Sequence, residues 1–393
     1  MHNIKNIYKD NRRKLNDDNF RIKVGLGITS ISNGNIDGIP QYTSSILKLK
    51  DSQDKLNIVP ISFGPHDKKL KPFFCPKTYS VRLIGQVLSM GKLKWFEDIP
   101  KDLSLFHATD NRIPVGLNIP VLATIHDVFP FTRPDLMKPS FNILGKQFLQ
   151  HALQKANHVI TVSEYSKTEI QKHFNFEESD ITVIPNGIQN FWFAKANNSE
   201  KERTIRAHSI DKPFLLVVGT VQPRKNYKKI IEAYGCLSTY WKQRVNLVIV
   251  GKNGWGVNLK KIIKRNKLEK NIIWLTDVSN AELSILYQSA SGLVFTSLAE
   301  GFGYPIIEAM ASKCPVITSC VTSMPEIAAS NALLVNPYSS EEITAAITNT
   351  LQHGKNINQN IKSGFKHANN FTEDLMLEKT YKTYLKILNS EKK

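Results

Sequence analysis

The sequence predicts an α/β fold built from two doubly wound domains. Short runs rich in valine and isoleucine alternate with helical patterns along the whole chain. Such an alternation is typical of parallel sheets that are covered by helices on both faces. The pattern runs once, pauses at residues 190–212, which are mainly polar and charged, and then runs again. At 393 residues the chain is long enough to form two hydrophobic cores.

Each predicted strand is a short apolar run bounded by polar or turn-forming residues. In the first half these runs are residues 22–28, 57–62, 121–125, 158–162 and 181–184. In the second half they are residues 214–218, 246–250, 272–275, 292–296, 315–318 and 333–335. Between them, apolar residues recur at helical spacing, for example at residues 227–234, 281–289 and 341–351.

These elements divide the chain into three predicted parts. The N-terminal domain occupies residues 1–189, of which residues 1–20 are polar and are expected to be flexible. Residues 190–212 form a linker region, and residues 213–372 form the C-terminal domain. An amphipathic helix is predicted at residues 371–388, with Thr372 as its expected N-cap.

The composition excludes several classes of protein. No run approaches about 18 apolar residues, so no membrane-spanning helix is expected. Residues 1–20 lack the apolar stretch of a signal peptide, and we therefore expect a cytoplasmic protein. The four cysteines are scattered without a Cys-x-x-Cys pair, which indicates neither a disulfide framework nor a zinc site.

The net charge of +18 fits either an anionic partner or simple solubility, and the sequence leaves both open. No helix-turn-helix, zinc-finger or RNP-type aromatic pattern is visible, so nucleic acid ranks below nucleotides and a membrane surface as the partner. Residues 141–156 have apolar residues at helical spacing. Such a helix packs on a core or lies on a membrane surface, and core packing is the commoner case.

Two carboxylates, Glu300 and Glu308, stand eight residues apart in a segment that is mostly apolar or glycine. Pro305 fits the first position of a helix, which places Glu308 inside that helix and Glu300 in the loop before it. Gly301 and Gly303 let the backbone approach a ligand closely. Two carboxylates that accept hydroxyl groups beside a positive helix end suit a sugar nucleotide. Each acid alone is also common as a loop or helix-start residue.

Other candidate residues follow predicted strands, where ligands bind in open parallel sheets. Arg224 and Lys225 lie between a strand and a helix, so they either hold a diphosphate or form a solvated basic turn. His126 and Asp127 also follow a strand and either face the substrate or include an aspartate that caps a turn. Because these residues come from both halves of the chain, we expect the site to lie in a cleft between the domains.

Three known ligand-binding motifs are incomplete or absent in the sequence. Residues 251–256 resemble a P-loop, but Val257 and Asn258 stand where Lys and Ser or Thr are needed. Residues 25–27 lack the third glycine of a dinucleotide fingerprint, which disfavours a nicotinamide oxidoreductase. No Asp-x-Asp pair is present to hold a metal-bound diphosphate. We therefore predict chemistry that uses neither a metal nor a cofactor, with Arg224, Lys225 and helix ends neutralising the phosphates.

In their order along the chain, these segments resemble the retaining glycosyltransferases of family 4, over roughly residues 21–390. The main motif is the pair of acids, Glu300 and Glu308. Residues 294–305 (VFTSLAEGFGYP), which precede and overlap this motif, also match. The supporting segments are residues 124–127 (TIHD), 159–166 (VITVSEYS), 184–187 (IPNG), 219–226 (GTVQPRKN), 248–255 (VIVGKNGW), 315–319 (PVITS) and 324–327 (MPEI).

The resemblance implies a role for each candidate residue. Glu300 contacts hydroxyls of the transferred sugar, Glu308 holds the ribose hydroxyls, and His126 reaches the sugar from the N-terminal domain. Arg224 and Lys225 hold the diphosphate and stabilise its leaving charge. The further donor-binding candidates are Gly38, Asp127, Gly219, Gly301, Phe302, Gly303 and Tyr304. No metal ligand is implied.

Some positions depart from the family's pattern. Many relatives have a second arginine after the glycine, where this chain has Thr220, so binding of the phosphates rests on Arg224 and Lys225. Pro40 stands where a small residue is common, which puts the shape of that loop in question. The form with Thr220 and residues 251–255 (GKNGW) is similar to a branch rich in mannosyltransferases for bacterial surface polysaccharide.

The resemblance implies the GT-B fold, in which a C-terminal helix crosses back to the N-terminal domain; here residues 373–393 would complete that domain. It implies transfer of a hexose, with mannose from GDP-mannose as the best match, with retention at the anomeric carbon. The acceptor would be a saccharide or a lipid-linked saccharide in the synthesis of lipopolysaccharide O-antigen or another surface polysaccharide. A peripheral contact with the cytoplasmic face of the inner membrane is a further expectation; nucleic acid is not an expected partner.

Two alternatives remain at this point. One is a sugar-nucleotide epimerase or a phosphorylase on the same fold. The other is a non-catalytic sugar-nucleotide-binding subunit that supports a partner transferase. The intact set of candidate residues argues against the second alternative.

Overall fold

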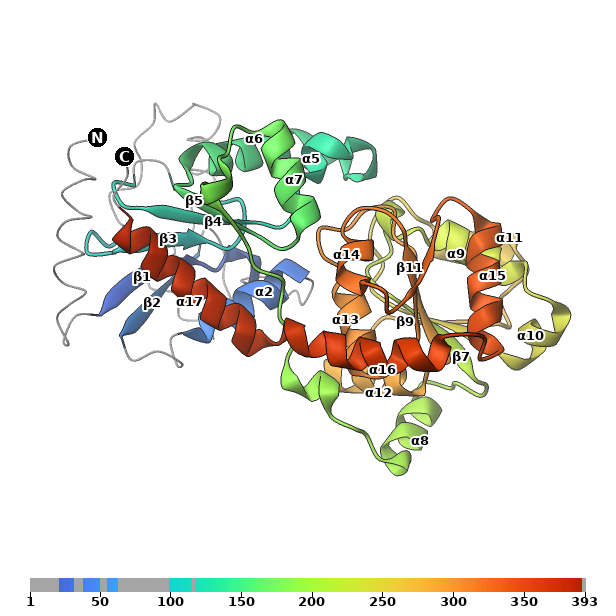
Figure 1. Cartoon of the computed structure of the whole chain (residues 1–393). Coiled ribbons are helices and arrows are strands. Elements are labelled where there is room, and N and C mark those ends of the chain that lie inside the picture. The colour runs from blue at the N-terminus through green and yellow to red at the C-terminus, as the bar shows by residue number, and fades with distance from the viewer. Residues whose placement is uncertain (1–20, 32–37, 50–54, 63–98, 115–116, 391–393) are drawn as a thin grey trace. The chain divides into compact units, whose positions relative to one another are not determined.

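The computed structural model describes residues 21–31, 38–49, 55–62, 99–114 and 117–390. The chain forms two compact units, whose elements are labelled in Figure 1. The first unit comprises residues 1–134, 139–185 and 374–393, and the second comprises residues 135–138 and 186–373. Residues 1–20, which the sequence predicts to be flexible, lie outside the described residues.

The first unit contains a parallel six-stranded sheet in the order β2-β1-β3-β4-β5-β6. Its strands are β1 (Ile22–Gly27), β2 (Leu56–Ile61), β3 (Leu105–Ala108), β4 (Val121–Ile125), β5 (His158–Thr161) and β6 (Ile181–Val183). Its helices are α2 (Gly38–Leu47), α5 (Phe129–Thr132), α6 (Pro139–Lys155), α7 (Glu164–His173) and α17 (Glu373–Asn389). The strand order reverses between β1 and β3, as in a doubly wound domain.

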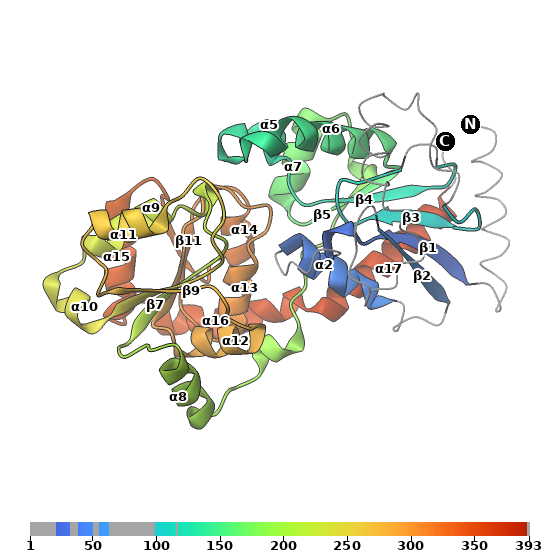
Figure 2. The ribbon, with the colours of Figure 1, turned by 180° about the vertical axis from the view of Figure 1, so that it is seen from behind.

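Helices cover both faces of this sheet. On one face, Met376, Tyr384 and Leu388 of α17 pack with α2 against Val24 and Leu122 of the sheet. Figure 1 shows α17 in front of the sheet, and Figure 2, seen from behind, shows it on the far side. Helices α6 and α7 pack on the opposite face. The expectation that the last helix completes the N-terminal fold is therefore confirmed.

Strand β3 is absent from the strands that the sequence predicts. It is only 4 residues long and contains His107, whose polar ring is unusual in a buried strand. The ring is satisfied internally, because Nδ1 lies 2.7 Å from the Tyr384 hydroxyl and Nε2 lies 2.8 Å from the Thr124 hydroxyl. These partners come from α17 and β4, so only the complete fold provides them.

The second unit repeats this architecture with the order β12-β11-β10-β7-β8-β9, again parallel throughout. Its strands are β7 (Phe214–Val218), β8 (Asn246–Val250), β9 (Ile272–Leu275), β10 (Gly292–Phe295), β11 (Val316–Ser319) and β12 (Leu333–Val335). Its helices are α8 (Asn198–Ala207), α9 (Tyr227–Gly235), α10 (Thr239–Arg244), α11 (Leu259–Arg265), α12 (Asn280–Ser289), α13 (Tyr304–Ala311), α14 (Met324–Ala328), α15 (Ser340–Leu351) and α16 (Ile357–Ala368). Its 3-10 turns include η5 (Asn190–Phe193) and η6 (Pro223–Lys225).

Residues 190–212 do not form the separate linker that their polar composition suggests. They contain η5 and α8 and belong to the second unit. Trp192 of η5 is buried, with its ring 5.8 Å from that of Tyr287. Asn197 begins α8 with a capping box, so the charged residues that follow lie on an ordinary amphipathic helix. The aromatic residues ahead of this helix anchor the segment in the core.

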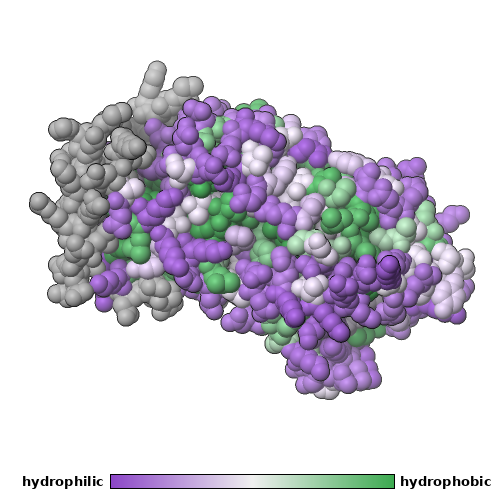
Figure 3. All heavy atoms as spheres, viewed as in Figure 1, coloured by the Kyte–Doolittle hydropathy of each residue, from purple (hydrophilic) through white to green (hydrophobic). Residues whose placement is uncertain are grey.

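Helix α6 is a core-packing helix, as the commoner reading of its sequence predicts. Leu149 and Leu153 are buried against the sheet, whereas Ile143 is 72% exposed. In the part of the chain that the structure describes, no helix is long and apolar enough to cross a membrane. The face of the molecule in Figure 3 is mainly hydrophilic over the described residues, with smaller hydrophobic areas between.

Candidate functional site

The strand order of the second sheet brings two of the predicted loops together. The chain runs from β7 outward to β9 and returns to β10 on the other side of β7. Ligands of doubly wound sheets bind at such a reversal, beyond the carboxyl ends of the two strands. The loop with Arg224 and Lys225 follows β7, and the loop with Glu300 follows β10. A backbone hydrogen bond from Leu298 to the Arg224 carbonyl, 2.7 Å long, joins them.

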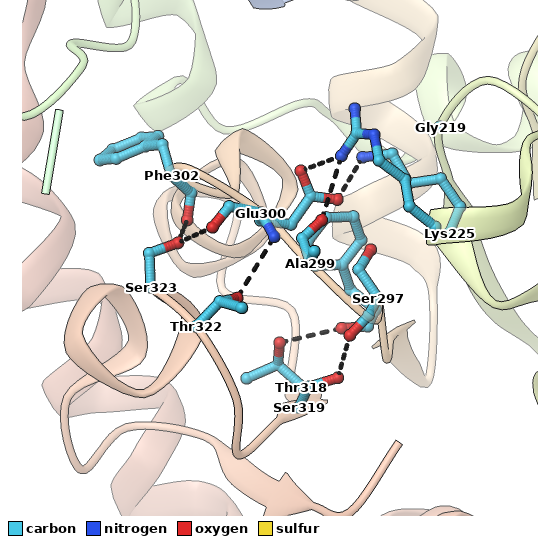
Figure 4. A network of polar contacts seen from close by, with 12 residues as sticks. Gly219, Lys225, Ser297, Ala299, Glu300, Phe302, Thr318, Ser319, Thr322 and Ser323 are labelled. Carbon is cyan, nitrogen blue, oxygen red and sulfur yellow. Dashed lines mark hydrogen bonds and ion pairs between the residues drawn. The ribbon is translucent and has the colours of Figure 1, made fainter. Parts of the chain in front are cut away.

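Glu300 pairs with both cations of the neighbouring loop. Arg224 Nη1 lies 2.5 Å from one carboxylate oxygen, and Lys225 Nζ lies 2.6 Å from the other. Figure 4 shows Glu300 and Lys225 pointing toward each other. The sequence predicts all three residues as site residues, but it assigns the cations to a diphosphate and the acid to a sugar. The acid therefore lies within ion-pair distance of the two cations that the sequence assigns to a diphosphate.

The charge state of Glu300 is fixed by these neighbours. Burial alone would raise the pKa of this carboxyl group, but the Arg224 and Lys225 charges outweigh burial and lower the pKa to about 2. The carboxylate is therefore ionised at any physiological pH. Lys225 also makes a cation–π contact, since its ammonium group lies 4.8 Å from the centre of the Phe295 ring.

The Glu300 loop is held by two hydroxyl side chains from the segment after β11. Ser323 donates hydrogen bonds to the Glu300 carbonyl (2.8 Å) and the Phe302 carbonyl (2.9 Å), and the Thr322 hydroxyl accepts one from the Glu300 amide. Figure 4 shows these contacts. The loop then reaches Gly303, whose φ of +113° favours glycine. Ser323 and Thr322 are not among the residues predicted from the sequence.

Gly219 lies beside Lys225, where a glycine is required. Its φ is +141°, and an added Cβ would lie 3.2 Å from Cε of Lys225. The Gly219 carbonyl accepts a hydrogen bond from the Tyr227 hydroxyl at the start of α9. Gly219 therefore shapes the seat of the Lys225 side chain, and it lies in the predicted group.

The glycine-rich segment that fails as a P-loop supports this same loop. The Val221 amide donates to the Lys252 carbonyl over 2.9 Å. A Cβ on Gly251 would lie 1.9 Å from the Gly219 carbonyl oxygen, and a Cβ on Gly254 would lie 2.3 Å from the Val221 carbonyl oxygen. The glycines therefore let the backbones after β7 and β8 touch.

We expect Gly251→Ala to destabilise the second unit by about 3 kcal/mol, because the added methyl group overlaps a backbone atom that cannot move away alone. The urea concentration at the unfolding midpoint measures this change. Gly235→Ala is the matched control, since its Cβ would meet only side-chain atoms, Leu268 Cδ1 at 3.6 Å and Asn266 Oδ1 at 4.0 Å. Equal midpoints for the two variants would contradict the prediction.

Glu308 lies inside α13, as predicted, and is 5% exposed. The helix begins one residue earlier than expected, because Tyr304 and not Pro305 is its first residue. The Tyr287 hydroxyl of α12 donates a 3.2 Å hydrogen bond to the Glu308 carboxylate. Gly301 and Phe302 lie in the loop before this helix, and both are buried. Tyr287 is not among the predicted site residues.

The remaining predicted residues lie in the first unit. His126 follows β4, and its Nε2 lies 3.1 Å from the carbonyl oxygen of Thr109, the residue after β3. The His126 and Tyr42 rings meet edge to face at 5.0 Å. Asp110, also just after β3, is bound by Arg112 at 2.6 Å. Because β3 is not predicted, neither Thr109 nor Asp110 is found from the sequence.

Asp127 makes a turn-capping contact, which is one of the two roles considered for it from the sequence. Its carboxylate accepts a 3.1 Å hydrogen bond from the Phe129 amide and so caps the turn into α5. Gly38 is the first residue of α2. The neighbouring Pro40 lies within the same helix, in its first turn, where proline is tolerated.

Burial lowers the pKa of His126 to about 4, although the hydrogen bond to Thr109 and the charge of Asp110 act in the opposite direction. The unfolded chain binds a proton at this histidine below about pH 6.5, whereas the folded protein does not until about pH 4. Stability that is present above pH 6.5 is therefore lost as the pH falls toward 4.

We expect the free energy of unfolding to fall by about 3 kcal/mol from this group between pH 7 and pH 4. Urea unfolding of the wild type and of His126→Gln at both pH values isolates the contribution, because the other titrating groups are common to both proteins. An equal loss of stability in the two proteins would mean that His126 is already protonated, or exposed, in the folded state.

In the described ranges, no group of three or more His, Cys, Asp or Glu residues could hold a metal ion. Cations that could bind an anion are present instead, in Arg224 and Lys225.

Comparison with known proteins finds matches to both units. Residues 198–367 match the family model described as "Glycosyl transferases group 1", and residues 91–189 match "Glycosyltransferase Family 4". The O-antigen chain mannosyltransferase RfbU of Salmonella typhimurium is 34% identical over 247 residues, which are 62% of this chain and 64% of that protein. O-antigen chain mannosyltransferase B of Escherichia coli is 30% identical over 250 residues, 63% and 65% of the two chains. The match thus spans less than two thirds of these relatives' length.

Solved structures share the fold at low sequence identity. A crystal structure of Anabaena Alr3699/HepE in complex with UDP-glucose has a TM-score of 0.73, with 18% identity over 93% of this chain and 99% of that chain. WaaG, a glycosyltransferase involved in lipopolysaccharide biosynthesis, has a TM-score of 0.69, with 15% identity over 92% and 99%. Both similarities extend over more than nine tenths of this chain, so they support the predicted fold.

Proposed function

We propose that the chain is a glycosyltransferase with the GT-B fold and that it transfers a hexose from a nucleoside-diphosphate sugar to an acceptor hydroxyl group. The observation that carries this proposal is the pairing of Glu300 with Arg224 and Lys225 at the strand reversal of the second sheet. Two partly buried cations beside one carboxylate suit a diphosphate that arrives together with a hydroxyl-rich sugar.

The donor and acceptor follow from the relatives. RfbU and mannosyltransferase B act in O-antigen chains, which favours mannose, with GDP-mannose as the donor. The neighbour solved with UDP-glucose supports a nucleotide sugar in general. The proposed acceptor is a saccharide or lipid-linked saccharide of an O-antigen or another surface polysaccharide. A lipid-linked acceptor would bring the chain to the cytoplasmic membrane face as a peripheral protein.

The proposed mechanism retains the configuration of the anomeric carbon and needs no metal. The bond between this carbon and the β-phosphate oxygen breaks, and the acceptor oxygen bonds to the carbon on the same face. The acceptor's proton passes to the leaving phosphate. Arg224 and Lys225 stabilise the negative charge that develops on the diphosphate, which is the largest expected contribution to the rate.

The other residues bind and orient the donor in this proposal. Glu300, once released from the cations, accepts hydroxyl groups of the transferred sugar. Glu308 accepts the ribose hydroxyls from its place in α13. His126, with its lowered pKa, is neutral at pH 7 and contacts the sugar as a hydrogen-bonding group and not as a charge.

A panel of nucleotide sugars tests the proposal. GDP-mannose is expected to raise the melting temperature most among GDP, UDP, dTDP and ADP sugars, and to release GDP slowly in the presence of EDTA. Transfer to a membrane extract that contains lipid-linked saccharide should follow. A donor sugar recovered as a new epimer, or release only with added phosphate, would contradict transfer. Tight donor binding without turnover would point to a binding subunit.

A further inference from the structure

Glu308 receives a hydrogen bond from a tyrosine that the proposed mechanism does not use. The Tyr287 hydroxyl lies 3.2 Å from Oε2 of Glu308, and both side chains are buried. They come from neighbouring helices, Tyr287 from α12 and Glu308 from α13. A hydrogen bond to a charged acceptor is directional, and at 3.2 Å this one lies at the long end of the range for hydroxyl donors. The tyrosine therefore fixes one of the two carboxylate oxygens in direction.

The position of the Tyr287 side chain is restrained by a ring contact with Trp192 and by the capped start of its own helix. Its ring packs edge to face against Trp192 at a centroid distance of 5.8 Å, and Trp192 is 2% exposed. The backbone of Trp192 is fastened to the end of α13 by a 3.4 Å hydrogen bond from the Ser312 hydroxyl to its carbonyl. Because Ser279 and Glu282 begin α12 with a capping box, the helix that carries Tyr287 starts at a fixed position.

The hydroxyl of Tyr287 remains a donor at every relevant pH. Burial raises the pKa of this phenol well above its usual value, and the charge of Glu308 and the hydrogen bond to it raise the pKa further. The pair is thus a neutral donor and a carboxylate acceptor. The hydrogen bond from Tyr287 restrains the orientation of the Glu308 carboxylate. It therefore also restrains the directions in which the carboxylate can accept further hydrogen bonds.

We propose that Tyr287 is the positioning residue for Glu308, and that it orients the carboxylate to accept the ribose hydroxyls of the nucleotide. The inference rests on the proposed function, because it takes from it the role of Glu308 at the ribose. It adds that the segment around Trp192, although remote from the phosphate-binding cations in the sequence, contributes to nucleotide affinity through Tyr287.

The test compares nucleotides with and without the ribose hydroxyls. Isothermal titration calorimetry of the full chain with GDP and with 2′,3′-dideoxy-GDP, and with the corresponding UDP pair, measures their affinities. We expect Tyr287→Phe to weaken binding of the preferred ribonucleotide about 10-fold and that of its dideoxy counterpart less than about 2-fold. Tyr234→Phe is the matched control, since that buried hydroxyl donates to the Val245 carbonyl in the same unit. It should leave both affinities unchanged.

A loss of stability alone cannot produce this difference, because both nucleotides bind the same folded protein. Equal weakening of the two nucleotides by Tyr287→Phe, or none, would overturn the inference. Glu308→Gln separates this failure from that of the proposed function. If Glu308→Gln removes the preference for the ribonucleotide and Tyr287→Phe does not, the ribose role stands and the positioning role falls. If Glu308→Gln keeps the preference, or if neither nucleotide binds the wild type, the ribose role fails and the inference fails with it.

Discussion

Replacing Lys225 by alanine is expected to lower the rate of transfer by on the order of 100- to 1000-fold, equivalent to about 3–4 kcal/mol of barrier. The Lys225 ammonium lies in a buried loop between Glu300 and the Phe295 ring, so water cannot replace its charge efficiently. The effect should fall mainly on kcat, because the negative charge on the leaving diphosphate is greatest in the transition state. Initial rates of GDP release from GDP-mannose with acceptor present measure it.

Lys229→Ala provides the control for this change. Lys229 lies on α9, close to Lys225 in the sequence, and pairs with Glu232 at 3.1 Å outside the site. This variant should keep the wild-type rate. Because Lys225→Ala also leaves Glu300 with one cation fewer, its melting temperature must be measured alongside. A folded Lys225→Ala variant with near-normal turnover would remove Lys225 from the proposed mechanism.

Replacing Glu300 by glutamine is expected to change binding and turnover in opposite directions. The carboxylate pairs with Arg224 and Lys225, so we expect it to compete with a diphosphate for these cations. Glutamine carries no charge, and GDP alone should therefore bind about 10-fold more tightly. Transfer should fall by about 100-fold or more, because the sugar loses a charged acceptor for its hydroxyl groups. Calorimetry with GDP and the transfer assay give the two numbers.

Glu232→Gln tests whether any lost carboxylate would do the same. It also removes an acid that pairs with lysines, but outside the site, and should change neither quantity. If Glu300→Gln weakened GDP binding in parallel with transfer, the carboxylate would be a support for the cations and not a competitor of the phosphate. The low pKa of Glu300, about 2, means that both effects should be independent of pH between 5 and 9.

The regular part of the fold could be predicted because most of its strands correspond to apolar runs in the sequence. Phe214–Val218 and Asn246–Val250 are buried throughout, and apart from Asn246 all of their residues are apolar. Strand β3 lacks this signal, because His107 interrupts a run of only 4 residues and needs Tyr384 and Thr124 as partners. Because β3 was not predicted, Asp110, which follows it, was not identified as a site residue. No pattern in the neighbouring sequence indicates Asp110.

The composition of the site could be predicted, but not its internal pairing. Strand ends indicated that Glu300, Arg224 and Lys225 would meet, since neighbouring parallel strands end at one edge of the sheet. All three were assigned to a ligand, and nothing in the sequence says which charges pair when no ligand is bound. Ser323 and Tyr287 act through hydrogen bonds to a loop and a buried acid. Tyr287 is buried beside Leu286 on α12, and a hydroxyl group at such a buried helical position is the signal that could have identified it.

The path of the chain has a consequence for synthesis. The second unit is made almost entirely of one continuous stretch, residues 186–373, whereas the first unit needs α17 from the end of the chain. Tyr384 and its partner His107 are 277 residues apart. At roughly 5–20 residues per second, a ribosome that has made β3 needs tens of seconds to deliver α17. During that time the second unit can bury its own core, while the face of the first sheet meant for α17 stays uncovered. The unit that emerges first is therefore the last to be completed.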